Sequence, residues 1–566
     1  TFQFHPLLLV GAAIGFGLLL RDEAQRPRAF LLGGTLLIHT AIVATYRAPQ
    51  AVEYMLPAYV PLVLLMGYGV GDLLRRTQTT RRAPLGVLLA ALLLTAGVTQ
   101  LVSHWPSYRA LHHSQDTAVY TDTILSHAPP NSLVLANWHW VTPLWYEQQV
   151  NGRRPDLDIV YLFPQTADYS AEWANRIQQE LDHGRAVVTT FYDEQSYQTL
   201  PPAQPLGEAY LFPSAPLTSL PPSFIPLDLV LGDALRLHGY QLSAPNTEIG
   251  QEAQLTVAWE PLAKEATLPL FAHLVGFDGA LVAQHDLTAV AQPNGLTLTQ
   301  FRLTPRWEAQ PGDHALLIGL ATDPASRTQL ATLAVTPMAF APATQHPTHQ
   351  QTSPPGTLIG HDWDNTIPNQ PRLYLHWQLA TGGYWSQVVQ PPDGRYTLPQ
   401  TSGVWGWPRP QTFVNERDRF YVPLGQGIVW FGSRPWLSSL SPLQPNQNVT
   451  IAQRFRATRP ILRDIGFSVR LLGFAEDNFT WQWRTPDTAD SDIPALGGIP
   501  TLKWIAGSQI DHPRTLTIDA NATPGQTVGG MVRPYDVFTN QPVPLLDGRL
   551  ATSPQPWLPL VPGTVE

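Results

Sequence analysis

The sequence contains no cysteine among its 566 residues. This absence excludes disulfides, thiolate zinc sites, iron–sulfur clusters and cysteine nucleophiles. Lysine is nearly absent too, since only Lys264 and Lys503 occur, and charged residues make up only 14% of the chain. With 34 basic and 43 acidic residues, and a net charge of −9, the chain lacks the basic surface that nucleic-acid binding needs, so we expect no nucleic-acid partner.

Several catalytic and cofactor motifs are also missing. The sequence has no GxGxxG or Walker A pattern for nucleotides, no HExxH for zinc and no GxSxG nucleophile elbow. Asp156 and Asp158 form a pair of the type that holds a metal in some sugar transferases, but Asp362/Asp364 and Asp490/Asp492 are spaced alike. The composition alone predicts about one such pair. We therefore assign no catalytic residue, no metal ligand and no resident cofactor.

The first 103 residues have the pattern of a membrane domain. Four apolar segments occur, and three of them run for 18–20 residues without a charge, the length that a helix needs to cross about 30 Å of hydrocarbon. A signal peptide is a single segment, so four segments argue against one. We predict four transmembrane helices at Pro6–Leu20, Ala29–Tyr46, Tyr54–Gly71 and Pro84–Ser103.

Arginine placement predicts the orientation of these helices. Three arginines lie between the first two segments and four between the last two, whereas Arg47 is the only one between the second and third. Because basic loops remain in the cytoplasm, we predict a multi-pass membrane protein with a large extracytoplasmic C-terminal region.

A few residues of the membrane domain are candidates for binding. His39 is an ionisable residue within a membrane segment, and Arg47, Glu53 and Tyr54 lie in or beside the predicted outer loop, where they could meet a lipid phosphate. Packing of His39 against a neighbouring helix and simple interfacial anchoring by the others are the structural alternatives. The glycines of Gly11–Gly15 and Gly67–Gly71 predict close helix packing.

Residues 104–225 predict an α/β domain. Short apolar strands at 132–136, 157–163 and 186–192 alternate with helices at 114–128, 140–150 and 171–183, which indicates a parallel sheet. Sites in such sheets form at the carboxyl ends of strands. Asn137, Trp138 and His139 follow the first strand, and together with Asp156 they form a second candidate site. Packing and the turn chemistry of asparagine explain the first three residues equally well.

From residue 226 onward the chain predicts β-sandwiches, because short alternating strands lie between Gly, Pro, Asn and Asp turns. An internal repeat pairs Gln254–Gly276 with Asn448–Gly473; each copy continues with an acidic turn and a late Pro-Gly. We expect two or three immunoglobulin-like domains. The predicted division is 1–103 membrane helices, 104–225 α/β domain, 226–340 β-sandwich, 341–355 linker, 356–441 β-rich domain and 442–566 second β-sandwich.

Two stretches carry a resemblance to a known family. The sequence Glu53-Tyr54-Met55-Leu56-Pro57-Ala58-Tyr59, with Pro143–Tyr146 and Val150–Asp156, is similar to bacterial multi-spanning proteins that resemble protein O-mannosyltransferases of the C-type fold. The resemblance implies a glycosyltransferase that takes its sugar from a polyprenyl-phosphate carrier. It also implies a catalytic carboxylate in the first external loop, ahead of these four helices. The chain begins at Thr1 without such a loop, so we expect it to be the C-terminal part of a longer protein.

Two classes of function follow. The leading hypothesis is the C-terminal portion of an integral-membrane glycosyltransferase whose partners are membrane lipid, a polyprenyl-phosphate sugar and a glycan or protein acceptor. A divalent metal, where one is used, would belong to the full-length protein. The rival is a non-enzymatic envelope protein, a membrane anchor that displays carbohydrate-binding or adhesive sandwiches. Ten of the 18 tryptophans lie between Trp363 and Trp504, where they could stack on sugars or fill sandwich cores.

Overall fold

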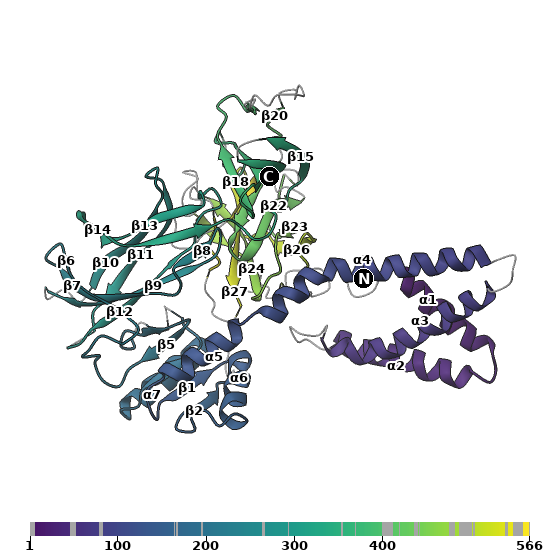
Figure 1. Ribbon diagram of the computed structural model, residues 1–566, viewed down its shortest axis with the longest axis horizontal. Helices are drawn as coiled ribbons and strands as arrows, with labels where there is room; N and C mark the ends of the chain where they lie inside the picture. The colour runs from purple at the N-terminus through teal and green to yellow at the C-terminus, as the bar shows by residue number, and fades with distance from the viewer. Residues whose placement is uncertain are drawn as a thin grey trace.

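A computed structural model shows apolar helices followed by a chain of β-rich domains (Figure 1). It describes residues 6–45, 53–77, 83–163, 165, 168–193, 196–197, 199–262, 267–292, 294–352, 355–367, 369–398, 411–417, 419–434, 440, 442–474, 481–485, 501, 504–537, 542–546 and 558–564. The coarse prediction of a helical region and then β-rich domains is confirmed.

The N-terminal region consists of α1 (Pro6–Arg21), α2 (Arg26–Thr45), the short 3₁₀ helix η1 (Glu53–Met55), α3 (Leu56–Arg76) and α4 (Ala83–His113). Three stretches are long and apolar enough to cross a membrane, namely α2, α3 and the stretch Gly86–His127, which includes most of α4. The first predicted span is shorter, because the 16 residues of α1 extend only about 24 Å.

Helix α4 is longer than the sequence predicted. We expected the apolar segment to end at Ser103, but the helix continues to His113 and reaches about 46 Å. The additional turns carry Trp105 and Tyr108, which are half exposed with ring centroids 5.6 Å apart. Aromatic residues of this kind are typical of the membrane–water interface. The helix therefore joins the membrane region directly to the α/β domain (Figure 1).

Glycines allow α1 and α3 to touch. A Cβ added to Gly15 would lie 1.9 Å from the carbonyl oxygen of Leu65, and one added to Gly69 would lie 1.9 Å from that of Gly11. The predicted pattern on α1 therefore makes the contact, whereas on α3 the contact residue is Gly69. Gly67 and Gly71, the ends of the predicted α3 pattern, have nothing within 4 Å of an added Cβ.

The α/β domain has three layers, with helices on both faces of one sheet whose strand order is β2-β1-β3-β5-β4. Strand β1 pairs in parallel with β2 and β3, while β5 and β4 complete the sheet in antiparallel fashion. Alternate residues of β1 point to opposite faces, so Leu133 and Leu135 pack toward α7, and Val134 and Ala136 toward α5 and α6. The elements are α5 (Asp116–His127), β1 (Leu133–Ala136), α6 (Trp138–Gln149), β2 (Asp158–Tyr161), α7 (Tyr169–Asp182), β3 (Val187–Thr189), β4 (Gln204–Leu206) and β5 (Ala209–Phe212).

The first sandwich combines a four-stranded sheet, β12-β9-β7-β6, with a five-stranded sheet, β11-β10-β13-β14-β8. Its core is continuous and includes Trp259, Leu270, Phe301 and Ile318, all completely buried. The strands are β6 (Ile225–Leu231), β7 (Leu235–Leu242), β8 (Asn246–Glu248), β9 (Ala253–Pro261), β10 (Thr267–Val275), β11 (Leu281–Val290), β12 (Thr297–Leu303), β13 (Gly312–Leu320) and β14 (Asp323–Thr336).

The second sandwich has the same strand arrangement. Its sheets are β21-β22-β23-β26 and β25-β24-β27-β28, which match β6-β7-β9-β12 and β11-β10-β13-β14 strand for strand. Phe455 and Phe467 meet in its core at 4.1 Å between ring centroids. The strands are β21 (Val422–Leu424), β22 (Ile428–Arg434), β23 (Asn448–Ala457), β24 (Ile465–Phe474), β25 (Trp481–Arg484), β26 (Gln509–Thr517), β27 (Thr527–Asp536) and β28 (Leu558–Thr564), with the 3₁₀ turn η2 (Gly425–Gly427) after β21. The sandwich therefore begins near residue 422 and not at the predicted 442.

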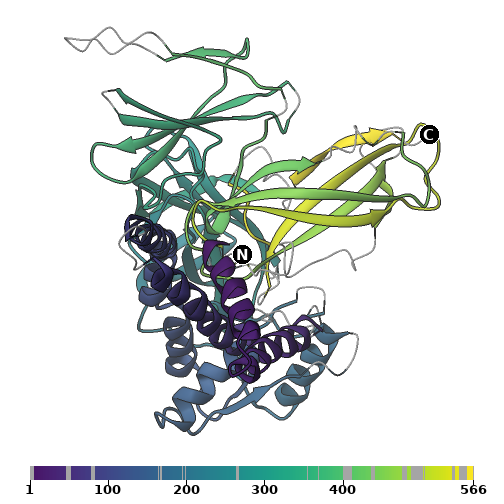
Figure 2. The same cartoon turned by 90° about the vertical axis from the view of Figure 1, so that its right-hand side faces the viewer.

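The segment predicted as a linker is part of a sheet. Within 341–355, β15 (His346–Thr352) forms the edge of the sheet β15-β16-β17-β18. An edge strand tolerates Pro347, because one side of its backbone needs no partner, and the pairing shifts register between Pro347 and Gln350. The remaining strands of this small β domain are β16 (Gly356–Asp364), β17 (Arg372–Leu379), β18 (Tyr384–Val389) and the pair β19 (Arg395–Thr397) and β20 (Thr412–Val414). Figure 2 shows this domain above the two sandwiches.

Candidate functional site

Glu53 and Tyr54, two of the predicted lipid-facing residues, lie at the end of the bundle opposite the arginine-rich helix ends. The His39 Nε2–H on α2 donates to the carbonyl oxygen of Tyr54 in η1 at 2.6 Å. This bond ties η1 to α2, and the Tyr54 side chain remains about half exposed. Glu53 begins η1, and Arg47 lies outside the described residues. The structure thus brings two of the four predicted residues together.

The residues that follow β1 are divided between two surfaces. The Asn137 carboxamide caps α6 by accepting from the backbone N–H of Trp140 at 3.4 Å, which is the turn chemistry expected of asparagine. Trp138 is 53% exposed and packs edge-on against Tyr161 at the end of β2. His139 instead lines a cavity on another side of the domain.

Asp156 does not belong to this group, and the predicted four-residue site is wrong on this point. It precedes β2, and the parallel register pairs Leu133 with Asp158 and Ala136 with Tyr161. Asp156 therefore lies at the amino edge of the sheet, opposite Asn137. There the Arg154 guanidinium, with contacts of 2.8 and 2.9 Å, holds the pKa of the Asp156 carboxyl well below its usual value. Its role is to fix the Arg154 turn.

A cavity of about 1280 Å³ lies where three domains meet. We call it the junction cavity. The α/β domain contributes α5, the start of α6 and the β4–β5 hairpin; the first sandwich contributes β7, β9 and β12; the second contributes the segment around Arg463 and Asp536 at the end of β27. Helix α5 follows α4 after two residues, so the cavity lies close to the end of the membrane region (Figure 1).

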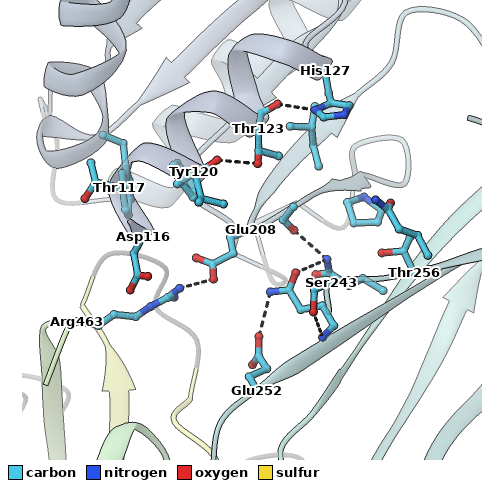
Figure 3. A pocket seen from close by; sticks show the side chains of 18 of the residues that line it. Asp116, Thr117, Tyr120, Thr123, His127, Glu208, Ser243, Glu252, Thr256 and Arg463 are labelled. Atoms are coloured by element: carbon cyan, nitrogen blue, oxygen red, sulfur yellow. Dashed lines mark hydrogen bonds and ion pairs between the residues drawn. The ribbon is translucent and has the colours of Figure 1, made fainter. Parts of the chain in front are cut away.

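The lining combines apolar residues such as Leu206 and Phe224 with many polar side chains. Figure 3 shows Arg463 reaching from the second sandwich to Glu208 on the β4–β5 turn, and the two form an ion pair across the junction. The Gln300 amide donates to the Gly207 carbonyl at 2.9 Å and joins the first sandwich to the same turn. Six glutamines line the cavity: Gln204, Gln241, Gln251, Gln254, Gln300 and Gln426.

An aromatic pair forms one part of the lining. The rings of Tyr120 on α5 and Trp140 on α6 stack with centroids 4.0 Å apart. Burial, aided by the nearby Glu208 carboxylate, raises the pKa of Tyr120 well above its usual value. The Tyr120 phenol is therefore a neutral hydroxyl that can donate a hydrogen bond at any physiological pH.

A serine, a histidine and an aspartate line up inside the small β domain. The Ser386 hydroxyl lies 2.9 Å from Nδ1 of His376, whose Nε2 lies 3.2 Å from the Asp362 carboxylate. A hydrolase triad uses the ring nitrogens in the opposite sense, with the serine on Nε2. All three side chains are enclosed, at 0–2% exposure, so no substrate reaches them. The array is a polar network of the interior.

The predicted tryptophan cluster is mainly core. Of the ten tryptophans between residues 363 and 504, five with described side chains are buried, which fits the packing alternative: Trp363, Trp377, Trp430, Trp483 and Trp504. No group of three or more His, Asp or Glu side chains in the described part of the chain could hold a metal ion. We derive no chemical step through a metal.

Comparisons with known proteins give little further information. No family model matches the chain, and no curated protein matches it. One similar solved structure is a Pseudomonas fluorescens alkylpurine DNA glycosylase, with 14% identity over 18% of this chain and 30% of that one, and a TM-score of 0.13. A Listeria innocua β-glucosidase has 11% identity over 52% of this chain and 60% of that one, with a TM-score of 0.14. A DUF4785 family protein from Legionella pneumophila has 10% identity over 55% of this chain and 57% of that one, with a TM-score of 0.12. The chain spans 30–60% of their lengths, and the similarity is too slight to carry an argument.

Proposed function

We propose that this chain is the C-terminal part of an integral-membrane glycosyltransferase that uses a polyprenyl-phosphate-linked sugar at the extracytoplasmic face of a bacterial membrane. The observation that carries the proposal is that η1 and the large domains lie at the same end of the helix bundle. The α1–α2 turn, the end of α3 and the start of α4 gather at one end of the bundle, with Arg21, Arg26 and Arg76. The η1 turn and the end of α4 lie at the other end.

The chemistry of the donor fits this arrangement. A carrier lipid presents its phosphate at the bilayer surface, beside the ends of α2 and α3. Arg47 belongs to the loop between these helices, and arginine binds phosphate through two parallel hydrogen bonds. The bond between His39 and Tyr54 ties η1, the start of the segment that follows Arg47, to α2. The transferred sugar would then face the α/β domain, which begins at the same end of the bundle.

The second candidate is a non-enzymatic envelope protein that binds glycans. The matching strand order of the two sandwiches favours it, because repeated sandwiches are typical of binding and adhesive modules. We propose that both are copies of one immunoglobulin-like domain. The repeat Gln254–Gly276 and Asn448–Gly473 supports the duplication, since β9 and β10 correspond in strand order to β23 and β24.

The decisive experiment is transfer from a radiolabelled polyprenyl-phosphate sugar by the full-length protein. We expect Arg47→Ala to weaken use of the lipid donor roughly 10- to 100-fold, the effect of one lost hydrogen bond to a charged group. The matched control is Arg28→Ala, at the opposite end of the bundle, which should leave donor use unchanged. Unchanged apparent affinity in Arg47→Ala would remove its assigned role, and absence of transfer by the wild type would favour the glycan-binding candidate.

A further inference from the structure

The junction cavity contains buried polar atoms that the fold leaves unpaired. The Tyr120 hydroxyl and the Gln204 amide nitrogen have no hydrogen-bond partner among the described residues, although these residues are only 6% and 4% exposed. Both residues line the cavity. An unpaired buried polar group costs folding free energy, so a bound molecule that reached these two atoms would supply a partner that the protein does not.

The remaining lining indicates what that ligand is. Glutamine amides both donate and accept hydrogen bonds, as the hydroxyl groups of a sugar do. Six glutamines face the cavity, and Ser243, Thr256 and Thr123 add hydroxyls. The half-buried Trp140 ring, which stacks on the buried ring of Tyr120, gives an aromatic surface of the kind on which sugar rings pack.

The charges disfavour an anionic ligand. Four carboxylates line the cavity: Asp116, Glu208, Glu252 and Asp536. The two lining arginines are both in ion pairs: Arg463 binds Glu208 and lies 3.7 Å from Asp536, and Arg459 lies 2.9 Å from Glu248. A phosphate or uronate entering the cavity would therefore meet an excess of negative charge.

The size of the cavity favours several sugar units. Small-molecule sites usually enclose about 300–1,000 Å³, and the junction cavity, at about 1280 Å³, is larger. From the unpaired atoms, the amide-rich lining, the charge and the volume, we infer that the junction cavity is a binding site for a neutral oligosaccharide. The inference goes beyond the proposed function: the ligand could be the acceptor of a transferase or the target of an anchored binding protein.

Direct binding to the purified full chain in detergent micelles tests the inference without any lipid donor. The probes are four neutral hexasaccharides, namely cellohexaose, maltohexaose, chitohexaose and α-1,6-mannohexaose, with hexagalacturonate as the anionic comparison. Isothermal titration calorimetry and saturation-transfer NMR measure binding. We expect at least one neutral probe to bind and hexagalacturonate not to bind. Binding of the anion alone, or of no neutral probe at millimolar concentration, overturns the inference.

Two variants locate the site. Tyr120→Phe removes only the unpaired hydroxyl, so we expect it to keep or raise the melting temperature; Gln204→Met removes the whole amide with its unpaired nitrogen. We expect both variants to bind saccharide roughly 3- to 10-fold more weakly. The matched control is Tyr197→Phe, which deletes a buried hydroxyl that donates to the Phe191 carbonyl at 3.2 Å in the same domain. That variant should lose stability and keep its affinity. Unchanged affinity in both cavity variants places the saccharide elsewhere and overturns the assignment.

Discussion

The Glu208 carboxylate and the Arg463 guanidinium form an ion pair between residues 255 positions apart in the sequence. Glu208 lies on the β4–β5 turn of the α/β domain, and Arg463 precedes β24 of the second sandwich. Although burial alone would lower the pKa of Arg463, the Glu208 carboxylate raises it above its usual value. The Arg463 guanidinium therefore stays charged, and the pair couples the first folded domain after the membrane helices to the last.

The first prediction concerns this pair. Arg463→Ala leaves Glu208 and Asp536 without their shared cation. Because Arg463 and Glu208 are each about a quarter exposed, we expect the free energy of unfolding to fall by about 1–2 kcal/mol. The melting midpoint by tryptophan fluorescence should fall by a few degrees. The matched control is Arg454→Ala, which breaks a more exposed pair with Asp511 inside the second sandwich. An equal effect of both variants would contradict a coupling role for Arg463.

The second prediction concerns the contact between α1 and α3. Gly15→Leu places a side chain where Leu65 O lies 1.9 Å from the first added carbon, so the helices must separate. We expect a loss of roughly 1–3 kcal/mol or more, the usual cost of overpacking, seen as a lower melting temperature in detergent. Gly67→Leu is the control, because that glycine is exposed on α3 and has nothing within 4 Å. Equal stability of the two variants would argue against the contact.

The third prediction concerns stability in acid. Nδ1 of His285 on β11 accepts the backbone N–H of Arg302 on β12 at 2.9 Å, a bond that requires a neutral ring. Burial, with the nearby Arg302 charge, lowers the pKa of His285 to about 4. The unfolded chain, with a pKa of about 6.5, takes up the proton first. This contribution is therefore complete above pH 6.5 and is lost as the pH falls toward 4.

Urea unfolding across this pH range provides the measurement. His285→Gln keeps a hydrogen-bond acceptor and removes the titrating ring. Between pH 6.5 and 4 the free energy of unfolding should therefore fall less in the variant than in the wild type, with a difference of at most about 3 kcal/mol. Part of the pH dependence should remain, because burial also lowers the pKa of His361 to about 4 and of His512 to about 3. His113→Gln, on the exposed end of α4, is the control. A pH profile identical to the wild type would contradict the assignment.

Local sequence patterns predicted individual helices and strands better than they predicted how these elements pack against one another. The apolar run Leu133–Ala136 predicted β1, because a short strand covered on both faces is apolar throughout. The internal repeat predicted a relationship that the strand orders of the two sandwiches now support. The linker prediction failed, since composition cannot distinguish a free Thr/Gln/His/Pro segment from an edge strand such as β15.

The junction cavity could not have been predicted. Tyr120, Gln204, Gln300 and Arg463 are separated by up to 343 positions and share no motif, so only the packing of three domains brings them together. Asn137 and Asp156 show the converse error. They are near in sequence and looked like one site. Asn137, however, follows β1, whereas Asp156 precedes β2, and because these strands are parallel the two residues lie at opposite edges of the sheet.

The last prediction concerns the orientation of the membrane region. Positive charge at the α1–α2 turn and at the end of α3 predicts that this end of the bundle lies in the cytoplasm, so the domains after α4 should lie outside. The chain has no cysteine, so Ala24→Cys in the α1–α2 turn and Gln115→Cys between α4 and α5 each introduce one exposed thiol. On intact cells a membrane-impermeant maleimide should label position 115 but not position 24, and permeabilised cells should show labelling at both. The reverse pattern would invert the orientation and place the junction cavity in the cytoplasm, where the proposed transfer at the outer face could not occur.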